Sequence, residues 1–495
     1  MSMSWAHPVL TGAETKALEQ RLLADEAAEW RAMQNAGRAV AAAVEKDFRE
    51  IGGAPANGRV LVLVGKGHNG GDACLAANEW LQTHPHAAAD VLLVYGTAAS
   101  RPLALRAWQD LQHRHRDRVR PVSVARLAND YALSLDGVFG FQFRPPLDAA
   151  ASEALAAANR RPVRLRAAID LPSGGGETGA FRADFTYVTG VVKREVLSLP
   201  HAGRLRYLDL GFFADAAPAS EDFVIADQVL APMRGWRDPS TEKRREGHVF
   251  VLAGSRSYPG AALMAVTAAL RAGAGLVTAF VPQSLVPAFS AQVPEAIWVG
   301  WPETPEGGLA LEGRHLLLER LDRTAALVVG PGLGRERESL ALAADVLKTV
   351  RVPVVVDADA LQPEVISGAT ATLVLTPHAG EFARIAGNRS LQEFAASAGA
   401  TVVLKSPRTR VCAGGAVYHN LLGGPVLARG GSGDLLAGVV GAQVARTPDD
   451  LLAAVCRGVA WHGRAADELA RAHGAHAVRT TQLLDFLSAA LRVPV

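Results

Sequence analysis

The sequence is poor in the features of secreted, membrane-spanning and nucleic-acid-binding proteins. Its 495 residues include only three cysteines, which are too far apart for a zinc site or a disulfide framework and indicate a reducing compartment. The N-terminal residues lack the basic and apolar regions of a signal peptide, and the longest apolar stretch, residues 261–281, is interrupted by Arg271. With a formal net charge of only +2, no large basic surface is predicted. We therefore expect a soluble cytoplasmic protein that uses neither a membrane nor a nucleic acid as a partner.

The composition is that of ordinary globular domains, with 49% hydrophobic and 20% charged residues. Short apolar runs typical of buried parallel strands alternate with glycine-rich loops and helical segments. This alternation predicts an α/β fold made of two Rossmann-like, three-layer α/β/α domains. A small-residue segment with a proline, residues 216–220, and the polar residues 234–247 indicate the join. We place the boundary near residue 222, between domains 1–222 and 223–495.

In the first half, an apolar strand at residues 59–64 runs into the loop Gly65-Lys66-Gly67-His68-Asn69-Gly70-Gly71-Asp72, and a helix is expected from Ala73 to about Gln82. A strand, a glycine-rich loop and a helix in this order present backbone N–H groups to a phosphate. The loop matches neither the standard dinucleotide fingerprint nor the Walker motif. Before it, residues 11–50 predict two helices with a break near residues 33–37.

Aspartates occupy the loops that follow three predicted strands of the first half, at Asp72, Asp136 and Asp170. The carboxyl ends of parallel strands meet at one edge of a sheet, where open α/β sheets bind ligands. A single aspartate of this kind is more often a turn or cap residue. The set of three, each beside glycine or proline, favours a common functional site.

The motifs at residues 66–72, 136–140 and 170–174 resemble those of the NAD(P)H-hydrate epimerase domain, over roughly residues 10–215. The resemblance implies that substrate is bound by two loops, made of His68, Asn69, Gly70, Gly71 and Asp72 and of Gly140, Phe141, Gln142, Phe143, Arg144, Pro145 and Pro146. It implies a potassium ion (K⁺) on the oxygen ligands of Asn69, Asp136 and Ser173. Asp170 would perform the proton chemistry at the substrate ring, or anchor the ring.

The sequence departs from the epimerase pattern at three places. His68 replaces the first asparagine of the glycine loop, Ala73 replaces the glycine after Asp72, and the usual Phe-Gly-Thr-Gly reads Phe139-Gly140-Phe141-Gln142. The implied ion ligands are kept, whereas the shape of the substrate pocket changes. A domain that has kept this fold and lost its activity therefore stays open as an alternative.

In the second half, successive predicted strands again end in chemically distinctive loops. These loops hold residues 254–261, 330–334, 357–361, 376–381 and 405–409. The last motif is Arg429-Gly430-Gly431-Ser432-Gly433-Asp434, which leads into an apolar helical run. Glycines at a helix start form an anion site, and Asp434 there would either cap the helix or act as a base.

These loops resemble the ribokinase-like superfamily, and in particular its NAD(P)H-hydrate dehydratase branch, over nearly all of residues 225–490. The resemblance implies that Ala261, Gly332 and His378 contact the hydrated nucleotide and that Asp434 faces its hydroxyl group. The adenine nucleotide would be held by Lys405, Ser406, Pro407, Arg408, Thr409 and Gly433. The family's Lys-Gly-Ala loop reads Lys405-Ser406-Pro407 here, and a proline has no N–H to donate.

The order of the two halves matches the bifunctional NAD(P)H-hydrate repair enzymes. The resemblance implies that hydrated NADH or NADPH (NADHX and NADPHX) is epimerised by the first half. The second half would phosphorylate the S epimer with ADP or ATP and Mg²⁺, and eliminate phosphate; bacterial members favour ADP. The alternative is a ribokinase-like vitamin or sugar kinase with an N-terminal non-catalytic binding domain. The small-residue helix after Ala261 suits a core or an interface, so a homo-oligomer stays open.

Overall fold

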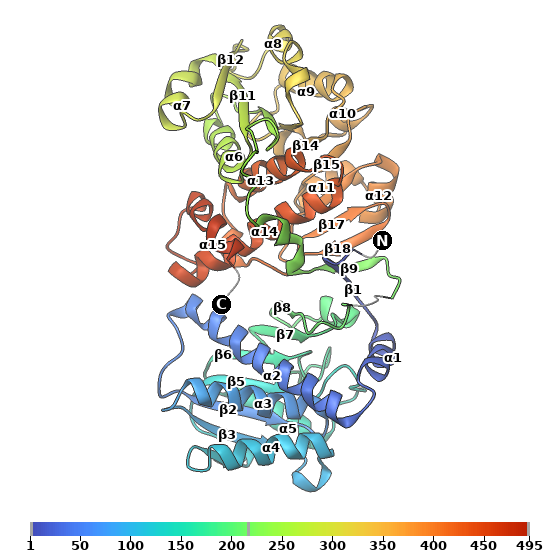
Figure 1. Ribbon diagram of the computed structural model, residues 1–495, viewed down its shortest axis with the longest axis vertical. Helices are drawn as coiled ribbons and strands as arrows, with labels where there is room; N and C mark the ends of the chain where they lie inside the picture. Colours follow the sequence, from blue (N-terminus) through green and yellow to red (C-terminus); the bar gives the residue numbers. More distant parts are fainter. Residues whose placement is uncertain (1–2, 215–217, 493–495) are drawn as a thin grey trace. The chain divides into compact units, whose positions relative to one another are not determined.

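The structure is a computed structural model that describes residues 3–214 and 218–492. The chain divides into two compact units, Met1–Ser220 and Glu221–Val495 (Figure 1). The predicted boundary near residue 222 coincides with the first residue of β9 (Asp222–Ile225), a strand of the second unit's sheet. Each unit is built on a largely parallel sheet, which confirms the predicted α/β class.

The first unit contains a parallel sheet with the strand order β4-β3-β2-β5-β6-β7-β8. Its strands are β2 (Arg59–Val64), β3 (Ala88–Leu93), β4 (Val119–Pro121), β5 (Tyr131–Gly137), β6 (Val163–Ile169), β7 (Phe185–Thr189) and β8 (Arg204–Leu208). The short strand β1 (Ala6–Pro8) comes first in the chain. The helices are α1 (Gly12–Leu22), α2 (Glu26–Phe48), α3 (His68–Thr83), α4 (Pro102–Arg114) and α5 (Ala149–Arg160).

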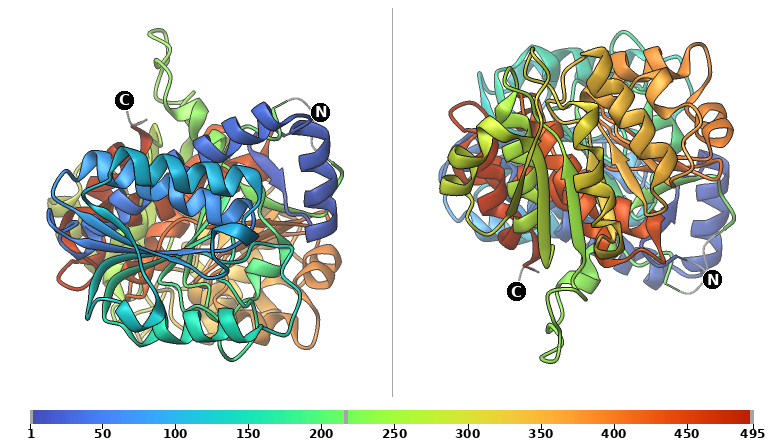
Figure 2. Two further views of the ribbon diagram at one scale, coloured as in Figure 1. Left: turned by 90° about the horizontal axis from the view of Figure 1, so that it is seen from below. Right: turned by 90° about the horizontal axis from the view of Figure 1, so that it is seen from above.

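The strand β2 shows why this sheet has helices on both faces. Its side chains alternate, so that Val60, Val62 and Val64 share a core with α2, α3 and α4, whereas Leu61 and Leu63 pack with α5. A strand buried on both faces is a continuous apolar run, which is why residues 59–64 could be recognised. The left panel of Figure 2 shows the blue helices on one side of the sheet and α5 on the other.

Two helix boundaries in the first unit differ from the prediction. The break between α1 and α2 falls at residues 23–25, not near residues 33–37, because Asp25 caps α2. Gly37 lies inside α2, and a Cβ atom there would approach Leu75 Cβ to 2.6 Å. The helix α3 begins at His68 rather than Ala73. In both places glycine permits close packing between elements instead of ending a helix.

The second unit has the sheet order β9-β18-β17-β16-β15-β14-β13-β10-β11-β12, and β17 pairs antiparallel with both of its neighbours. Its strands are β9, β10 (His248–Leu252), β11 (Leu276–Pro282), β12 (Ile297–Trp301), β13 (Ala326–Val329), β14 (Val354–Val356), β15 (Leu373–Leu375), β16 (Thr401–Leu404), β17 (Arg410–Ala413) and β18 (Ala416–His419). The lime-green strands β11 and β12 form one edge (Figure 2, right).

The helices of the second unit are α6 (Pro259–Arg271), α7 (Val286–Gln292), α8 (Arg314–Leu318), α9 (Arg337–Thr349), α10 (Pro363–Ile366), α11 (Ala379–Ala386), α12 (Leu391–Ala398), α13 (Ser432–Arg446), α14 (Leu451–His473) and α15 (Leu487–Leu491). The helices α9 and α12 share a core with Phe250 and Leu327 of the sheet. On the opposite face α13 lies against Val328, so the unit has three layers.

Small residues let α13 occupy the centre of the second unit. A Cβ atom on Gly438 would lie 2.2 Å from Ala265 O of α6, and one on Gly441 would lie 2.5 Å from Val328 Cγ2. The small-residue helix α6 is thus packed in the core of the unit. None of the helices within residues 3–214 and 218–492 has the length and apolar character needed to cross a membrane.

Candidate active sites

The first unit contains a cavity of about 430 Å³ lined by residues that follow β2, β5, β6 and β7. These are carboxyl ends of parallel strands, as the sequence predicted. Most of the predicted substrate residues line it, namely His68, Asn69, Asp72, Gly140, Phe141, Gln142, Phe143, Arg144, Pro146 and Asp170. Gly70, Gly71 and Pro145 are not among the lining residues. The N–H groups of Gly70 and Gly71 donate to Gly67 O inside the first turn of α3.

The three predicted ion ligands of the first unit are joined through the loop after β5. Asn69 Nδ2 donates to Phe139 O at 2.7 Å, Phe139 N donates to Ser173 Oγ at 2.8 Å, and Ser173 N donates to Asp136 Oδ2 at 2.7 Å. Burial raises the pKa of Asp136 to about 6, although the hydrogen bonds that its carboxylate accepts from Ser173 and Val138 lower it. No Lys or Arg in the described part of the chain pairs with this carboxylate. A buried acid among hard oxygen donors fits an alkali cation.

Asp170 forms an ion pair with Lys193, and both side chains are almost fully buried, with 9% and 2% exposed. Lys193 Nζ also donates to Thr189 O at 3.4 Å. Burial raises the pKa of Asp170, and the Lys193 ammonium opposes this shift. Asp170 has a φ of 68°, a left-handed conformation that is costly for a residue with a Cβ atom. The local fold therefore holds this carboxylate in one place, facing the cavity.

Two further carboxyl groups lie around the Lys193 ion pair. Burial raises the pKa of Asp72 well above its ordinary value, and Asp170 and Glu19 add to the shift. Burial also raises the pKa of Glu19, to about 7. Glu19 belongs to α1 and lines the cavity. Glu19 could not be recognised from the sequence, because an acid on a helix about fifty residues before the glycine loop carries no local signal.

In the second unit, the predicted loops gather at the carboxyl edge of the parallel strands. A Cβ atom on Gly332 would lie 2.9 Å from Ala261 Cβ, so these two predicted substrate residues are neighbours. Gly431, with a φ of 89°, faces Met264 of α6, whose Sδ would be 2.5 Å from a Cβ atom. The N-terminal turns of α6 and α13 therefore lie side by side.

Asp434 does not cap α13 in the structure. The N-cap of α13 is Gly431, and Asp434 lies three residues later, in the first turn, with no capping hydrogen bond from its side chain. Burial, reinforced by Asp357, raises the pKa of Asp434 to about 7, although Lys405 opposes the shift. The first-turn N–H groups of Gly433 and Asp434 have no helical acceptor and can bind an anion. A carboxyl poised near neutral pH is thus placed beside an anion site.

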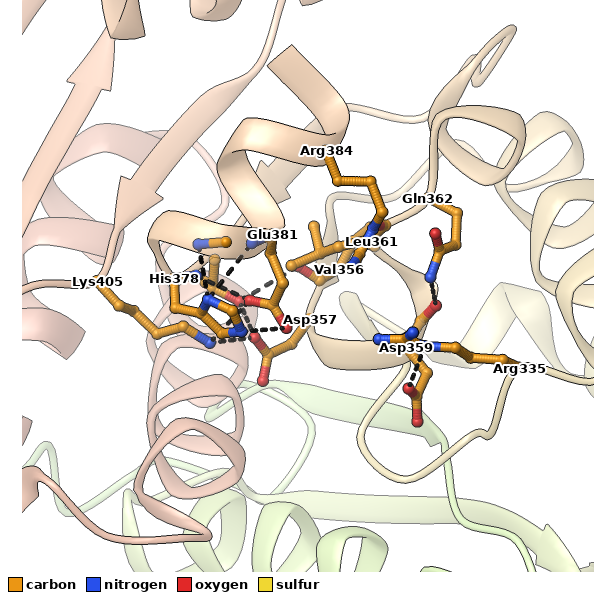
Figure 3. A network of polar contacts seen from close by, with 12 residues as sticks. Arg335, Val356, Asp357, Asp359, Leu361, Gln362, His378, Glu381, Arg384 and Lys405 are labelled. Atoms are coloured by element: carbon orange, nitrogen blue, oxygen red, sulfur yellow. Dashed lines mark hydrogen bonds and ion pairs between the residues drawn. The ribbon is translucent and has the colours of Figure 1, made fainter. Parts of the chain in front are cut away.

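A network of charged groups surrounds Lys405 next to this turn (Figure 3). Lys405 Nζ lies 2.7 Å from Asp357 Oδ1 and 3.8 Å from Glu381 Oε2. Burial lowers the pKa of Lys405, but these two carboxylates outweigh it and leave the pKa raised. A Cβ atom on Gly433 would lie only 3.2 Å from Lys405 Nζ. The lysine ammonium therefore lies directly at the glycine turn, with Asp357 and Glu381 holding it.

The remaining predicted residues of the second site lie beside this network. His378 caps α11 and accepts hydrogen bonds at Nδ1 from Gly380 N and Glu381 N, while its ring stays exposed. Its strand end pairs with Lys405. The nucleotide loop is a turn closed by its own side chains, since Ser406 Oγ donates to Arg408 O and Thr409 Oγ1 donates to Ser406 O. Pro407 lies at the tip of this turn.

The residues that sequence reasoning missed in the second unit are Asp357 and Glu381. Both lie inside motifs that were recognised, but only the fold brings them to Lys405. Among the described residues, no group of three or more His, Cys, Asp or Glu side chains is placed to hold a metal ion. Mg²⁺ that arrives with a nucleotide is held largely by phosphate oxygens, which does not require such a group.

Both units match family models. Residues 30–195 match the YjeF-related protein N-terminus, and residues 249–489 match NAD(P)H-hydrate dehydratase. The bifunctional NAD(P)H-hydrate repair enzyme Nnr of Moorella thermoacetica is 34% identical over 93% of this chain and 92% of its own length. The chain belongs to this family of bifunctional repair enzymes.

Another family member, from Gloeobacter violaceus, is 35% identical over 96% of both chains. Among solved structures, the ADP/ATP-dependent NAD(P)H-hydrate dehydratase of Bacillus subtilis, co-crystallised with ATP/Mg²⁺, is 29% identical, with a TM-score of 0.46. That similarity covers 53% of this chain and 95% of the solved chain. The alignments with the two repair enzymes therefore extend over both units of this chain.

Proposed function

We propose that the two units carry out successive steps in the repair of hydrated nicotinamide cofactors. The first unit interconverts the R and S epimers of NADHX or NADPHX. The second unit converts the S epimer back to NADH or NADPH at the expense of an adenine nucleotide. The observation that supports the second step most directly is the position of Asp434. Its carboxyl does not cap α13, has a raised pKa, and lies beside Lys405 and the N-terminus of the helix.

The proposed dehydration overcomes the poor leaving ability of hydroxide. Asp434 takes the proton from the substrate hydroxyl as that oxygen bonds to the terminal phosphorus of the nucleotide, whose P–O bond breaks to release AMP from ADP or ADP from ATP. Lys405 and the N–H groups of Gly433 and Asp434 stabilise the charge on the transferring group. Phosphate then leaves with its C–O bonding pair, and a proton leaves the adjacent ring carbon, which restores the double bond. Bound Mg²⁺ would supply further neutralisation of the phosphate charge.

The proposed nucleotide site uses the turn from Lys405 to Thr409 together with Gly433. Pro407 offers no N–H, so the backbone donors left in the turn are those of its neighbours. Ala261, Gly332 and His378 would contact the hydrated nucleotide at the same edge. ADP is the proposed co-substrate, and ATP is the alternative that the assay below compares.

For the first unit, we propose that substrate occupies the cavity between α3 and the loop of residues 140–146. Asn69, Asp136 and Ser173 would hold K⁺, which fits the unpaired buried carboxylate of Asp136. Asp170 is assigned the anchoring role for the ring because Lys193 already engages its carboxylate. The altered residues His68, Phe141 and Gln142 line this cavity, whereas Ala73 does not, and the charged groups Asp72, Asp170 and Lys193 are kept.

The test uses the separated R and S epimers of NADPHX with the full chain, Mg²⁺ and either ADP or ATP. Absorbance of restored NADPH is followed. We expect rapid recovery from the S epimer, and recovery from the R epimer that is faster than its spontaneous epimerisation. No recovery from the S epimer would overturn the repair function and favour a small-molecule kinase. Recovery from S alone would leave the first unit as a binding domain.

A further inference from the structure

The helix α1 contributes to the first site although it lies outside residues 30–195, the part that matches the YjeF-related model. Glu19, in the third turn of α1, lines the same cavity as Asp72, Asp170 and Lys193. The function proposed for this unit assigns no role to any residue of α1.

The attachment of α1 fixes Glu19 beside Lys193. Just before the helix, Leu10 N donates to Val192 O at 3.0 Å and Arg194 N donates to Leu10 O at 2.7 Å, so the chain pairs with the residues on both sides of Lys193. Leu18, adjacent to Glu19, is buried in a cluster with Leu10 and Val191. A packed helix with these two anchors holds a side chain in a defined position.

The groups that face Glu19 come from four separate elements. They are Lys193 after β7, Asp170 after β6, Glu29 on α2 and Asp72 on α3. Burial is the largest cause of the raised pKa of Glu19, about 7; Lys193 lowers it, and Asp170 and Glu29 raise it further. Lys193 Nζ donates hydrogen bonds to the Asp170 carboxylate and to Thr189 O. Glu19 is therefore left as a carboxyl that changes protonation near neutral pH, where proton transfer is most efficient.

We propose that Glu19 is the proton-transfer residue of the epimerisation site, and that Asp170 and Lys193 hold the ring for it. This inference rests on the function proposed for the first unit. The substrate hydroxyl and the ring nitrogen are bonded to the same carbon, so one carboxylate with two oxygens can serve both. No other co-reactant is needed.

Glu19 takes the hydroxyl proton, the oxygen forms a carbonyl with that carbon, the carbon–nitrogen bond breaks, and the electron pair on nitrogen receives the proton from Glu19. Rotation of the free carbonyl and the reverse sequence close the ring with the opposite configuration. The net change is an inversion at one carbon, with the carboxylate restored.

The decisive experiment compares Glu19→Gln with a charge-matched swap, Glu19→Gln/Gln20→Glu. Gln20 is the exposed neighbour on the same helix, so the swap keeps the net charge and moves the carboxyl to solvent. Recovery of NADPH from the R epimer reports epimerisation, and recovery from the S epimer reports the second unit of the same chain. We expect epimerisation to fall about 100-fold or more in both variants, with recovery from S unchanged. Gln20→Glu alone should behave like the unaltered chain.

The pH profile separates proton transfer from a structural effect. In the unaltered chain, kcat/KM for epimerisation should show an ionisation near 7, which Glu19→Gln removes and Glu19→Asp retains at reduced rate. If Glu19→Gln epimerises within twofold of the normal rate, or more slowly with the same pH profile, the role of Glu19 is overturned and the function proposed for the first unit stands. Failure of the unaltered chain to epimerise at all overturns the function proposed for the first unit, and Glu19's role with it.

Discussion

In both units a lysine lies among carboxylates at the carboxyl edge of a parallel sheet. The two lysines differ in whether their ion-pair partner is the acid that the sequence predicted to be catalytic. In the first unit, Lys193 pairs with Asp170, the acid at the predicted catalytic position. In the second unit, Lys405 pairs with Asp357 and Glu381, and Asp434 is left without a direct ion pair among the described residues. In each unit one acid outside these ion pairs, Glu19 or Asp434, has its pKa raised to about 7, and this acid is the candidate for moving protons.

The largest expected effect is at the unengaged acid of the second unit. Asp434→Asn keeps the shape of the side chain but cannot accept the hydroxyl proton. We expect dehydration of the S epimer to fall at least about 1000-fold in kcat, with epimerisation of the R epimer unchanged. NADPH recovery and direct separation of the epimers measure the two steps. Turnover near the normal rate would remove Asp434 as the base.

The next effect compares the two lysines in stability. Lys193→Met leaves Asp170 as an uncompensated buried charge, which costs about 3–5 kcal/mol. Lys405→Met should cost less, because its side chain is 21% exposed and water reaches the site. Amide hydrogen exchange in β6 and β7, and in β15 and β16, reports each unit separately. Equal losses of stability in the two units would contradict a difference in burial between Lys193 and Lys405.

A smaller effect concerns stability and pH. Because the folded-state pKa of Asp434, about 7, exceeds its ordinary value of 3.8, the folded state binds more protons than the unfolded state between these two pH values. Stability of the second unit should therefore fall as pH rises through this window. Asp434→Asn removes the penalty, so the inactive variant should be more stable at pH 8, by up to about 4 kcal/mol. Thermal unfolding at pH 5 and pH 8 measures the difference; an unchanged pH dependence would contradict it.

The smallest effect sharpens the role of the engaged acid. Asp357→Asn removes a negative charge that raises the pKa of Asp434 and frees Lys405 from its partner. Both changes lower the pKa of Asp434, so the rise of kcat/KM with pH should move to lower pH. We also expect the KM for nucleotide to change by about tenfold, because Lys405 is no longer held at Gly433. Asp359→Asn, which lies farther along the same loop, is the control and should give a smaller shift in the same direction.

Much of the fold could be predicted from the sequence, because buried parallel strands are short apolar runs. Residues 59–64 form a strand as expected, β13 and β14 end directly before the predicted loops 330–334 and 357–361, and the predicted loops meet at one edge in each unit. Helix boundaries were less legible, since glycine was interpreted as a helix breaker. Gly37, Gly70 and Gly71 lie inside helices at points of close contact with α3, the β2 loop and Met33. Local sequence does not reveal which neighbour requires a missing Cβ atom.

The sequence by itself determined the two-unit α/β plan, the family and the glycine turn that ends in Asp434. The tertiary structure alone decided how the charges are shared. In the folded chain, Asp357 and Glu381 form ion pairs with Lys405, and Asp170 forms one with Lys193. Glu19 lines the first cavity, although its helix is remote in sequence from every motif. The physical reason is that motifs are local in the chain, whereas burial and ion pairing depend on distances in space, and these distances set the pKa values that distinguish one acid from another.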